Sequence, residues 1–170
     1  AAYCYHKAIA LKVAHGAYLN NYALVLAQQK KFDEAQTQLT KAAQVDPPNA
    51  GKYYYNLGAV YVNTGNMEPA TVAFKKAIEL DPNYAHAHAW RGCILGQAWT
   101  YGWCENLEAT QVEIERELKV APALDDNDSD VHRMLAAVYV IQNDFNRPGQ
   151  HQQRALSLNP NSDLTLVQQR

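Results

Sequence analysis

The chain has 170 residues, enough for one ordinary domain or one stretch of a repeat array. Hydrophobic residues make up 48% and charged residues 19%, which is typical of a folded chain and not of a disordered one. The net charge of −2 argues against a nucleic-acid surface, three cysteines are too few for a disulfide scaffold, and no apolar run could span a membrane. We therefore expect a cytoplasmic protein that binds neither nucleic acid nor membrane.

Small and apolar residues recur at a constant spacing, which indicates internal repeats. A small residue returns in steps of 34, 35, 44 and 34 residues, and the apolar residue three places later keeps the same steps. The agreement indicates a repeat of 34 residues, with one insertion of a single residue and one of ten. The two columns are Ala8, Ala42, Ala77, Ala121 and Ala155, and Leu11, Val45, Leu80, Leu124 and Leu158.

The repeat divides the chain into a single array of units. Residues 1–15 are expected to be the second helix of a cut unit, followed by units at 16–50, 51–84, 85–128 and 129–162 and by the start of another at 163–170. Because no polar capping helix is visible at either end and the chain does not begin with Met, we expect a window from a longer array that lacks its natural N-terminus. The alternative is that the uncapped ends stack on other copies of the chain.

The unit at 51–84 shows most clearly why each unit is a helix hairpin. Apolar residues from Tyr54 to Tyr61 recur at helical spacing, and a loop signal follows at residues 63–66. A second apolar stripe runs over residues 70–80, and Pro82 stops that helix because proline cannot continue the helical hydrogen bonding. Neither helix buries its stripe alone, so neighbouring hairpins must stack.

These residues resemble the tetratricopeptide repeat (TPR) family, and the resemblance covers essentially the whole chain. It implies an all-α fold, a right-handed α-solenoid of antiparallel helix hairpins, in which small residues such as Gly58 and Ala70 let the helices cross closely. From about Ala87 onward the chain also resembles the repeat regions attached to bacterial class III adenylate cyclases, whose catalytic domain would lie outside this chain. The matching TPR residues are Tyr54, Leu57, Gly58, Tyr61, Ala70, Phe74, Ala77 and Pro82.

The unit at 85–128 carries the ten-residue insertion. We predict its first helix from His86 to about Ala98 and its second from near Asn106 towards Ala121. Pro122 would end the second helix about a turn early.

Three aromatic residues, Trp99, Tyr101 and Trp103, lie in this insertion. Large aromatic side chains are usually buried, so the favoured interpretation is a hydrophobic plug packed on the neighbouring helices. The alternative is a partner-binding tip, because aromatic residues are common binding hot spots.

In TPR arrays the first helix of each unit lines the inner face of the curve. Counting along these helices predicts a peptide-binding groove of amides and aromatics with few charges, which suits an extended or helical peptide. The alternative, a solvated inner wall without a ligand, stays open. The predicted groove residues are Asn20, Asn21, Leu24, Lys52, Tyr55, Asn56, Asn63, His86, Trp90, Gln97 and Arg133.

The sequence contains no recognisable motif for catalysis or metal binding. His86 and His88 are two residues apart, so on a helix they point to different sides. The acidic run at 125–130 lacks the turn glycine of a calcium loop, and Asp128 or Ser129 is expected to cap the next helix instead. We therefore predict no catalytic residue, no metal ligand and no cofactor.

The leading functional hypothesis is a non-enzymatic scaffold or adaptor that binds a peptide or protein segment in the groove. Two alternatives stay open. One is a structural solenoid that assembles into a filament or homo-oligomer through its uncapped ends, and the other is a regulatory segment of a multidomain bacterial enzyme such as an adenylate cyclase.

Overall fold

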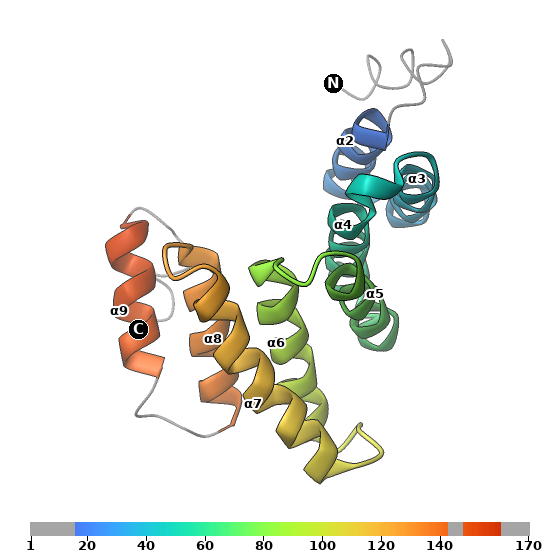
Figure 1. Cartoon of the computed structure of the whole chain (residues 1–170). Coiled ribbons are helices and arrows are strands. Elements are labelled where there is room, and N and C mark those ends of the chain that lie inside the picture. The colour runs from blue at the N-terminus through green and yellow to red at the C-terminus, as the bar shows by residue number, and fades with distance from the viewer. Residues whose placement is uncertain (1–15, 143–147, 161–170) are drawn as a thin grey trace. The chain divides into compact units, whose positions relative to one another are not determined.

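A computed structural model describes residues 16–142 and 148–160, and all regular structure in these ranges is helical. The all-α expectation is therefore confirmed, and the helices predicted within residues 1–15 and 163–170 lie outside the described residues. The helices are α2 (Gly16–Gln28), α3 (Phe32–Val45), α4 (Ala50–Asn63), α5 (Met67–Leu80), α6 (Ala85–Tyr101), α7 (Leu107–Leu124), α8 (Ser129–Ile141) and α9 (Pro148–Leu158), with a 3-10 turn at Pro47–Asn49 (Figure 1).

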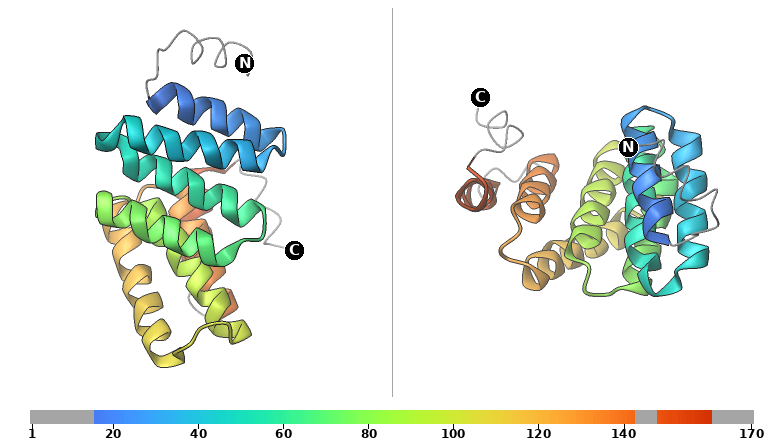
Figure 2. Two further views of the ribbon diagram at one scale, coloured as in Figure 1. Left: turned by 90° about the vertical axis from the view of Figure 1, so that its right-hand side faces the viewer. Right: turned by 90° about the horizontal axis from the view of Figure 1, so that it is seen from above.

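The chain divides into two compact units, residues 1–82 and 83–170, and each contains two helix hairpins. In the first unit α2, α3, α4 and α5 stack side by side with nearly antiparallel axes (Figure 2). Its largest core cluster joins Leu26 of α2, Leu39 of α3 and Leu57 of α4. This cluster joins the two hairpins. Burying each such side chain stabilises the fold by about 1.5–3 kcal/mol.

Helices α4 and α5 cross closely at Gly58, as the sequence predicts. A Cβ atom at this position would lie 2.7 Å from the ring of Phe74, which is fully buried. Ala70, the second small residue of the predicted crossing, is also fully buried. The prediction that a small residue marks the crossing is therefore confirmed for Gly58.

Three hairpin turns share one hydrogen-bonded geometry. Lys30, Gly65 and Gly102 each follow a first helix and adopt a left-handed backbone, with φ of 60°, 76° and 69°. The next residue then donates its N–H to a carbonyl five residues back, the Schellman motif that closes helix ends. These bonds are Lys31 N–H to Leu26 O (2.9 Å), Asn66 N–H to Tyr61 O (2.9 Å) and Trp103 N–H to Ala98 O (2.8 Å).

The second helices end alike, and their ends reproduce the repeat in the sequence. In each, the residue after the helix donates its backbone N–H to the carbonyl of the small residue that defines the repeat. The pairs are Asp46 to Ala42 (3.0 Å), Asp81 to Ala77 (2.8 Å), Asp125 to Ala121 (3.2 Å) and Asn159 to Ala155 (2.9 Å). The repeat spacing predicted from the sequence is therefore the spacing between the ends of successive second helices.

In the second unit the insertion lengthens both helices of its first hairpin. Helices α6 and α7 have 17 and 18 residues, whereas α4 and α5 have 14 each. The predicted end of the first helix near Ala98 is wrong by about one turn, because the helix continues to Tyr101 and closes at Gly102. The predicted early stop at Pro122 is also wrong. The proline lies in the last turn of α7, where its missing N–H costs only one helical bond before the helix ends at Leu124.

The plug interpretation holds for only one of the three aromatic residues of the insertion. Trp99 is half-buried and packs against the core of the second unit. Tyr101 and Trp103 are 64% and 66% exposed, so for them the favoured plug is wrong. Tyr101 is the last residue of α6 and Trp103 lies in the turn after it, and neither belongs to the core cluster of the second unit.

Candidate functional site

Three asparagines on the first helices of the first unit form a connected row. Asn56 of α4 donates from Nδ2 to Asn20 Oδ1 at 2.6 Å, and Asn20 donates from Nδ2 to Asn21 Oδ1 at 3.3 Å. Asn20 is only 3% exposed, whereas Asn21 is exposed and Asn56 is half-buried. Asn20 therefore holds the other two amides in place, and Asn21 and Asn56 are the more accessible members of the row.

The remaining predicted groove residues of the first unit flank this row in different ways. Leu24, Lys52 and Asn63 are exposed on α2 and α4. Tyr55 is half-buried, and its ring lies 5.7 Å from that of Phe74, measured between centroids. Tyr55 is thus anchored on the α4–α5 core.

A surface hollow of about 720 Å³ also lies in the first unit, but among other residues. Its apolar lining includes Tyr54 and Tyr61 of α4 and Val72 of α5, and its charged lining includes Lys76 and Glu79. None of the predicted groove residues lines it. The amide row of α2 and α4 is therefore distinct from this hollow.

In the second unit two predicted residues meet acidic side chains at the start of α8. His86 Nε2 lies 3.3 Å from Asp128 Oδ2, and Arg133 Nε lies 3.3 Å from Asp130 Oδ1. The ligand-capable atoms of His86, Asp128 and Asp130 lie within 4.8 Å of one another. The sequence did not predict this grouping, because the packing of α6 against α8 creates it and no local spacing encodes it.

The other predicted residues of this unit are half-buried. Trp90 packs against the core of the second unit, and Gln97 is half-buried on the same helix. Asp128 accepts the N–H groups of Asp130 and Val131 at 2.8 and 3.0 Å. The prediction that the acidic run supplies a helix cap is therefore confirmed for Asp128.

A buried ionic network, which the sequence reasoning missed, joins α6 to α7. His88 Nδ1 lies 2.5 Å from Glu117 Oε2, and Arg91 bonds to both Glu117 and Glu113. Burial raises the pKa of Glu117, but the hydrogen bond from His88 and the charge of Arg91 outweigh it, so the pKa lies below its ordinary value. Glu117 is therefore a buried carboxylate held by the Arg91 guanidinium and the His88 imidazole.

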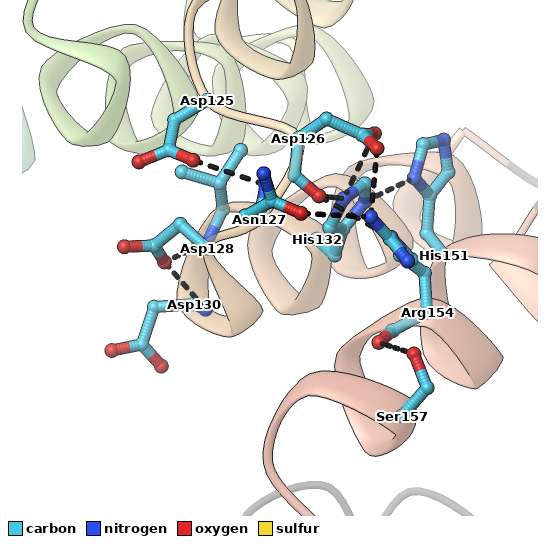
Figure 3. Close-up of polar contacts among 10 residues, drawn as sticks. Asp125, Asp126, Asn127, Asp128, Asp130, His132, His151, Arg154 and Ser157 are labelled. Atoms are coloured by element: carbon cyan, nitrogen blue, oxygen red, sulfur yellow. Dashed lines mark hydrogen bonds and ion pairs between the residues drawn. The ribbon is translucent and has the colours of Figure 1, made fainter.

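A second polar cluster joins α9 to α8 and to the loop before α8 (Figure 3). The Nδ1 atoms of His132 and His151 lie 2.9 Å apart, and His132 Nε2 lies 3.0 Å from the backbone oxygen of Asp126. Arg154 donates to the Asp126 carboxylate at 3.0 Å. Burial, together with the neighbouring His132, lowers the pKa of His151, although the Asp126 charge opposes this. The cluster therefore joins the two helices of the last hairpin.

Among the described helices, none is both long and apolar enough to cross a membrane. That the chain has no catalytic residue, no metal ligand and no cofactor stays a prediction.

Comparisons with known proteins agree with the architecture. Tetratricopeptide-repeat models match residues 17–49 and 51–84, the two hairpins of the first unit. The small glutamine-rich tetratricopeptide repeat-containing protein 2 of Mycosarcoma maydis is 33% identical over 79 residues, which are 46% of this chain and 22% of that protein. This chain thus matches about a fifth of the relative's length. The likeness of the later residues to cyclase-linked repeats stays a prediction.

Three solved structures share the fold. PilF of Pseudomonas aeruginosa aligns over 97% of this chain and 70% of its own, with 21% identity and a TM-score of 0.69. A thermophilic TPR protein of Thermus thermophilus aligns over 90% and 80%, with 19% identity and a TM-score of 0.70. YrrB, described as a TPR protein with an unusual peptide-binding site, aligns over 99% of both chains, with 18% identity and a TM-score of 0.53. The likeness establishes a helical-repeat fold.

Proposed function

We propose that this chain is a protein-interaction scaffold whose first unit binds an extended peptide segment along α2 and α4. The observation that carries the proposal is the row Asn21–Asn20–Asn56. A buried amide orients two accessible ones there, so their donors and acceptors are held ready before a ligand arrives.

Amide side chains suit a peptide backbone because each offers both a donor and an acceptor. Asn56 uses one N–H for Asn20 and makes no other hydrogen bond among the described residues, so its carbonyl oxygen can accept from a peptide N–H. Tyr55, fixed against Phe74, supplies apolar area beside it. Lys52 adds one exposed positive charge, which favours a peptide with an acidic residue near that end.

The comparisons support the coarser part of this proposal. The hairpins that carry the amide row are the ones that match the TPR models, and YrrB shows that a protein of this fold can carry a peptide-binding site. A scaffold needs no catalytic group, so we include a non-enzymatic role in the proposal. Assembly through the chain ends and a regulatory role within a larger enzyme depend on residues outside those described.

The test is a selection of phage-displayed peptides on the whole chain, followed by affinity measurements on the variant Asn21→Ala/Asn56→Ala. We expect the variant to bind the selected peptides about tenfold more weakly or worse, since two positioned hydrogen bonds are lost. Gln44→Ala, which removes an exposed amide from α3, is the matched control and should change nothing. Equal binding by the wild type and the double variant would refute the proposal.

A further inference from the structure

We propose that the tip of the α6–α7 hairpin is a second binding surface, specific for a basic protein segment rich in arginine or lysine. We define the tip as residues 101–108. Its centre is the pair Tyr101 and Trp103, whose rings stack with centroids 4.9 Å apart. These rings are 64% and 66% exposed, whereas Trp90 and Trp99 of the same unit pack on its core.

The tip is an ordered turn that does not need these rings. Gly102 takes the left-handed conformation, and the N–H of Trp103 bonds to Ala98 O, which closes α6. On the other side, Asn106 Oδ1 accepts the N–H of Ala109 at 2.9 Å and caps α7. Backbone bonds and one asparagine therefore fix the turn, so two large exposed rings need a reason other than folding.

Charge indicates what these rings would bind. Residues 92–115 contain four glutamates and no lysine or arginine. Glu113 is paired with Arg91, but Glu105 and Glu108, next to the rings, are exposed and make no ion pair among the described residues. A surface of stacked aromatic faces beside unpaired carboxylates complements a guanidinium or ammonium group, through cation–π contact and charge attraction together.

Apolar area around the rings extends the surface. Leu107, at the start of α7, is 52% exposed. It would contact the aliphatic part of a long cationic side chain, since arginine and lysine bury their stems against apolar groups while their charge stays solvated. Basic residues alternating with small apolar ones are therefore the partner chemistry that fits the tip.

This site is independent of the amide row, because it lies in the other unit and selects the opposite charge. The probe is a fluorescein-labelled peptide of about twelve residues built from Arg-Leu-Arg-Gly, with its Glu-Leu-Glu-Gly counterpart. Binding to the full chain is measured by fluorescence anisotropy at about 50 mM and about 300 mM NaCl. We expect the arginine peptide to bind, more weakly at the higher salt, and the glutamate peptide not to bind.

Two double variants locate the site. Tyr101→Ala/Trp103→Ala and Glu105→Gln/Glu108→Gln should each weaken binding about tenfold, because each removes one of the two attractions. The matched control Glu34→Gln/Glu68→Gln removes the same charge from exposed positions of the first unit and should change binding less than about twofold. Unchanged circular dichroism would show that the variants remain folded.

Three results would overturn the proposal. The wild type fails to bind the arginine peptide, or the aromatic variant binds it as the wild type does, or the control weakens binding as much as the tip variants. Sedimentation of the free chain could give a fourth result that would overturn the proposal. If the wild type self-associates and Tyr101→Ala/Trp103→Ala abolishes this, the tip is a contact between copies and not a site for a basic segment.

Discussion

At the scale of single residues, the second unit places ionisable side chains where water does not reach. Glu117 is 2% exposed and His88 is 3% exposed, and each is the other's partner. Removing one member of such a set leaves the others buried and uncompensated, which costs far more than losing a surface ion pair.

Replacing Glu117 with Gln should lower the free energy of unfolding by about 3–5 kcal/mol, because it breaks a buried ion pair. Glu113→Gln is the matched control, since that glutamate bonds to the same Arg91 but is 49% exposed. It should cost less than about 1 kcal/mol. Urea unfolding followed by circular dichroism measures both, and equal losses would contradict our view of the network.

Acid should loosen the last hairpin through His151. The Nδ1···Nδ1 contact with His132 needs one donor and one acceptor, so the pair cannot hold a proton on every nitrogen. Because the pKa of His151 is lowered in the folded chain, the unfolded chain binds more protons below the ordinary value of 6.5. Stability is therefore full above that value and falls as the pH drops below it.

The measurement is the thermal unfolding midpoint of the wild type and of His151→Gln at about pH 7.5 and about pH 5.5. The variant lacks this titrating group and should lose less stability between the two pH values. If acid lowered both midpoints equally, the pH dependence would arise elsewhere in the chain.

Residue-level roles could be predicted from the sequence where local chemistry decides them. Gly58 at the helix crossing and Asp128 as a helix cap were both predictable, because each depends on neighbours in the same hairpin or turn. The burial of Asn20 and the pairing of His132 with His151 were not. Both depend on which helices pack together, and the sequence around an asparagine or a histidine does not show which partner it will contact.

At the scale of elements, the first three hairpins share one turn geometry and differ in the residue that adopts the left-handed conformation. The turn after α2 uses Lys30 where the turns after α4 and α6 use glycine. A side chain in the left-handed region costs about 1–2 kcal/mol, since its Cβ crowds the following carbonyl. The repeat period predicted the ends of the second helices. The helix bounds around the insertion were misjudged, because Pro122 and Gly102 were each compatible with more than one helix length.

Lys30→Gly should therefore stabilise the first unit, by about 0.5–1 kcal/mol after the greater flexibility of glycine in the unfolded chain is subtracted. Gly65→Ala is the converse change. No atom lies within 4 Å of a Cβ at Gly65, so its effect would come from the backbone alone. We expect it to lower the thermal midpoint while Lys30→Gly raises it, and shifts of the same sign would disprove a shared turn geometry.

At the scale of the whole molecule, each unit has a core of its own. The clusters of the first unit draw on residues between Leu19 and Ala73, and the cluster of the second on residues between Ala85 and Tyr139. Units of this size bury enough apolar surface for marginal stability without a staple. Repeat proteins of this kind gain stability from hairpin to hairpin, so a chain can lose one part and keep another.

We therefore predict that the two units unfold separately. Fragments 1–82 and 83–170 should each be helical, and their circular dichroism spectra should add up to that of the whole chain. In the whole chain, Glu117→Gln should shift only the transition of the second unit, because the network it breaks lies within α6 and α7. Hydrogen exchange read by mass spectrometry distinguishes the units directly. If the variant lost protection equally in α3 and in α8, the chain would be a single cooperative body and the division at residue 82 would have no energetic meaning.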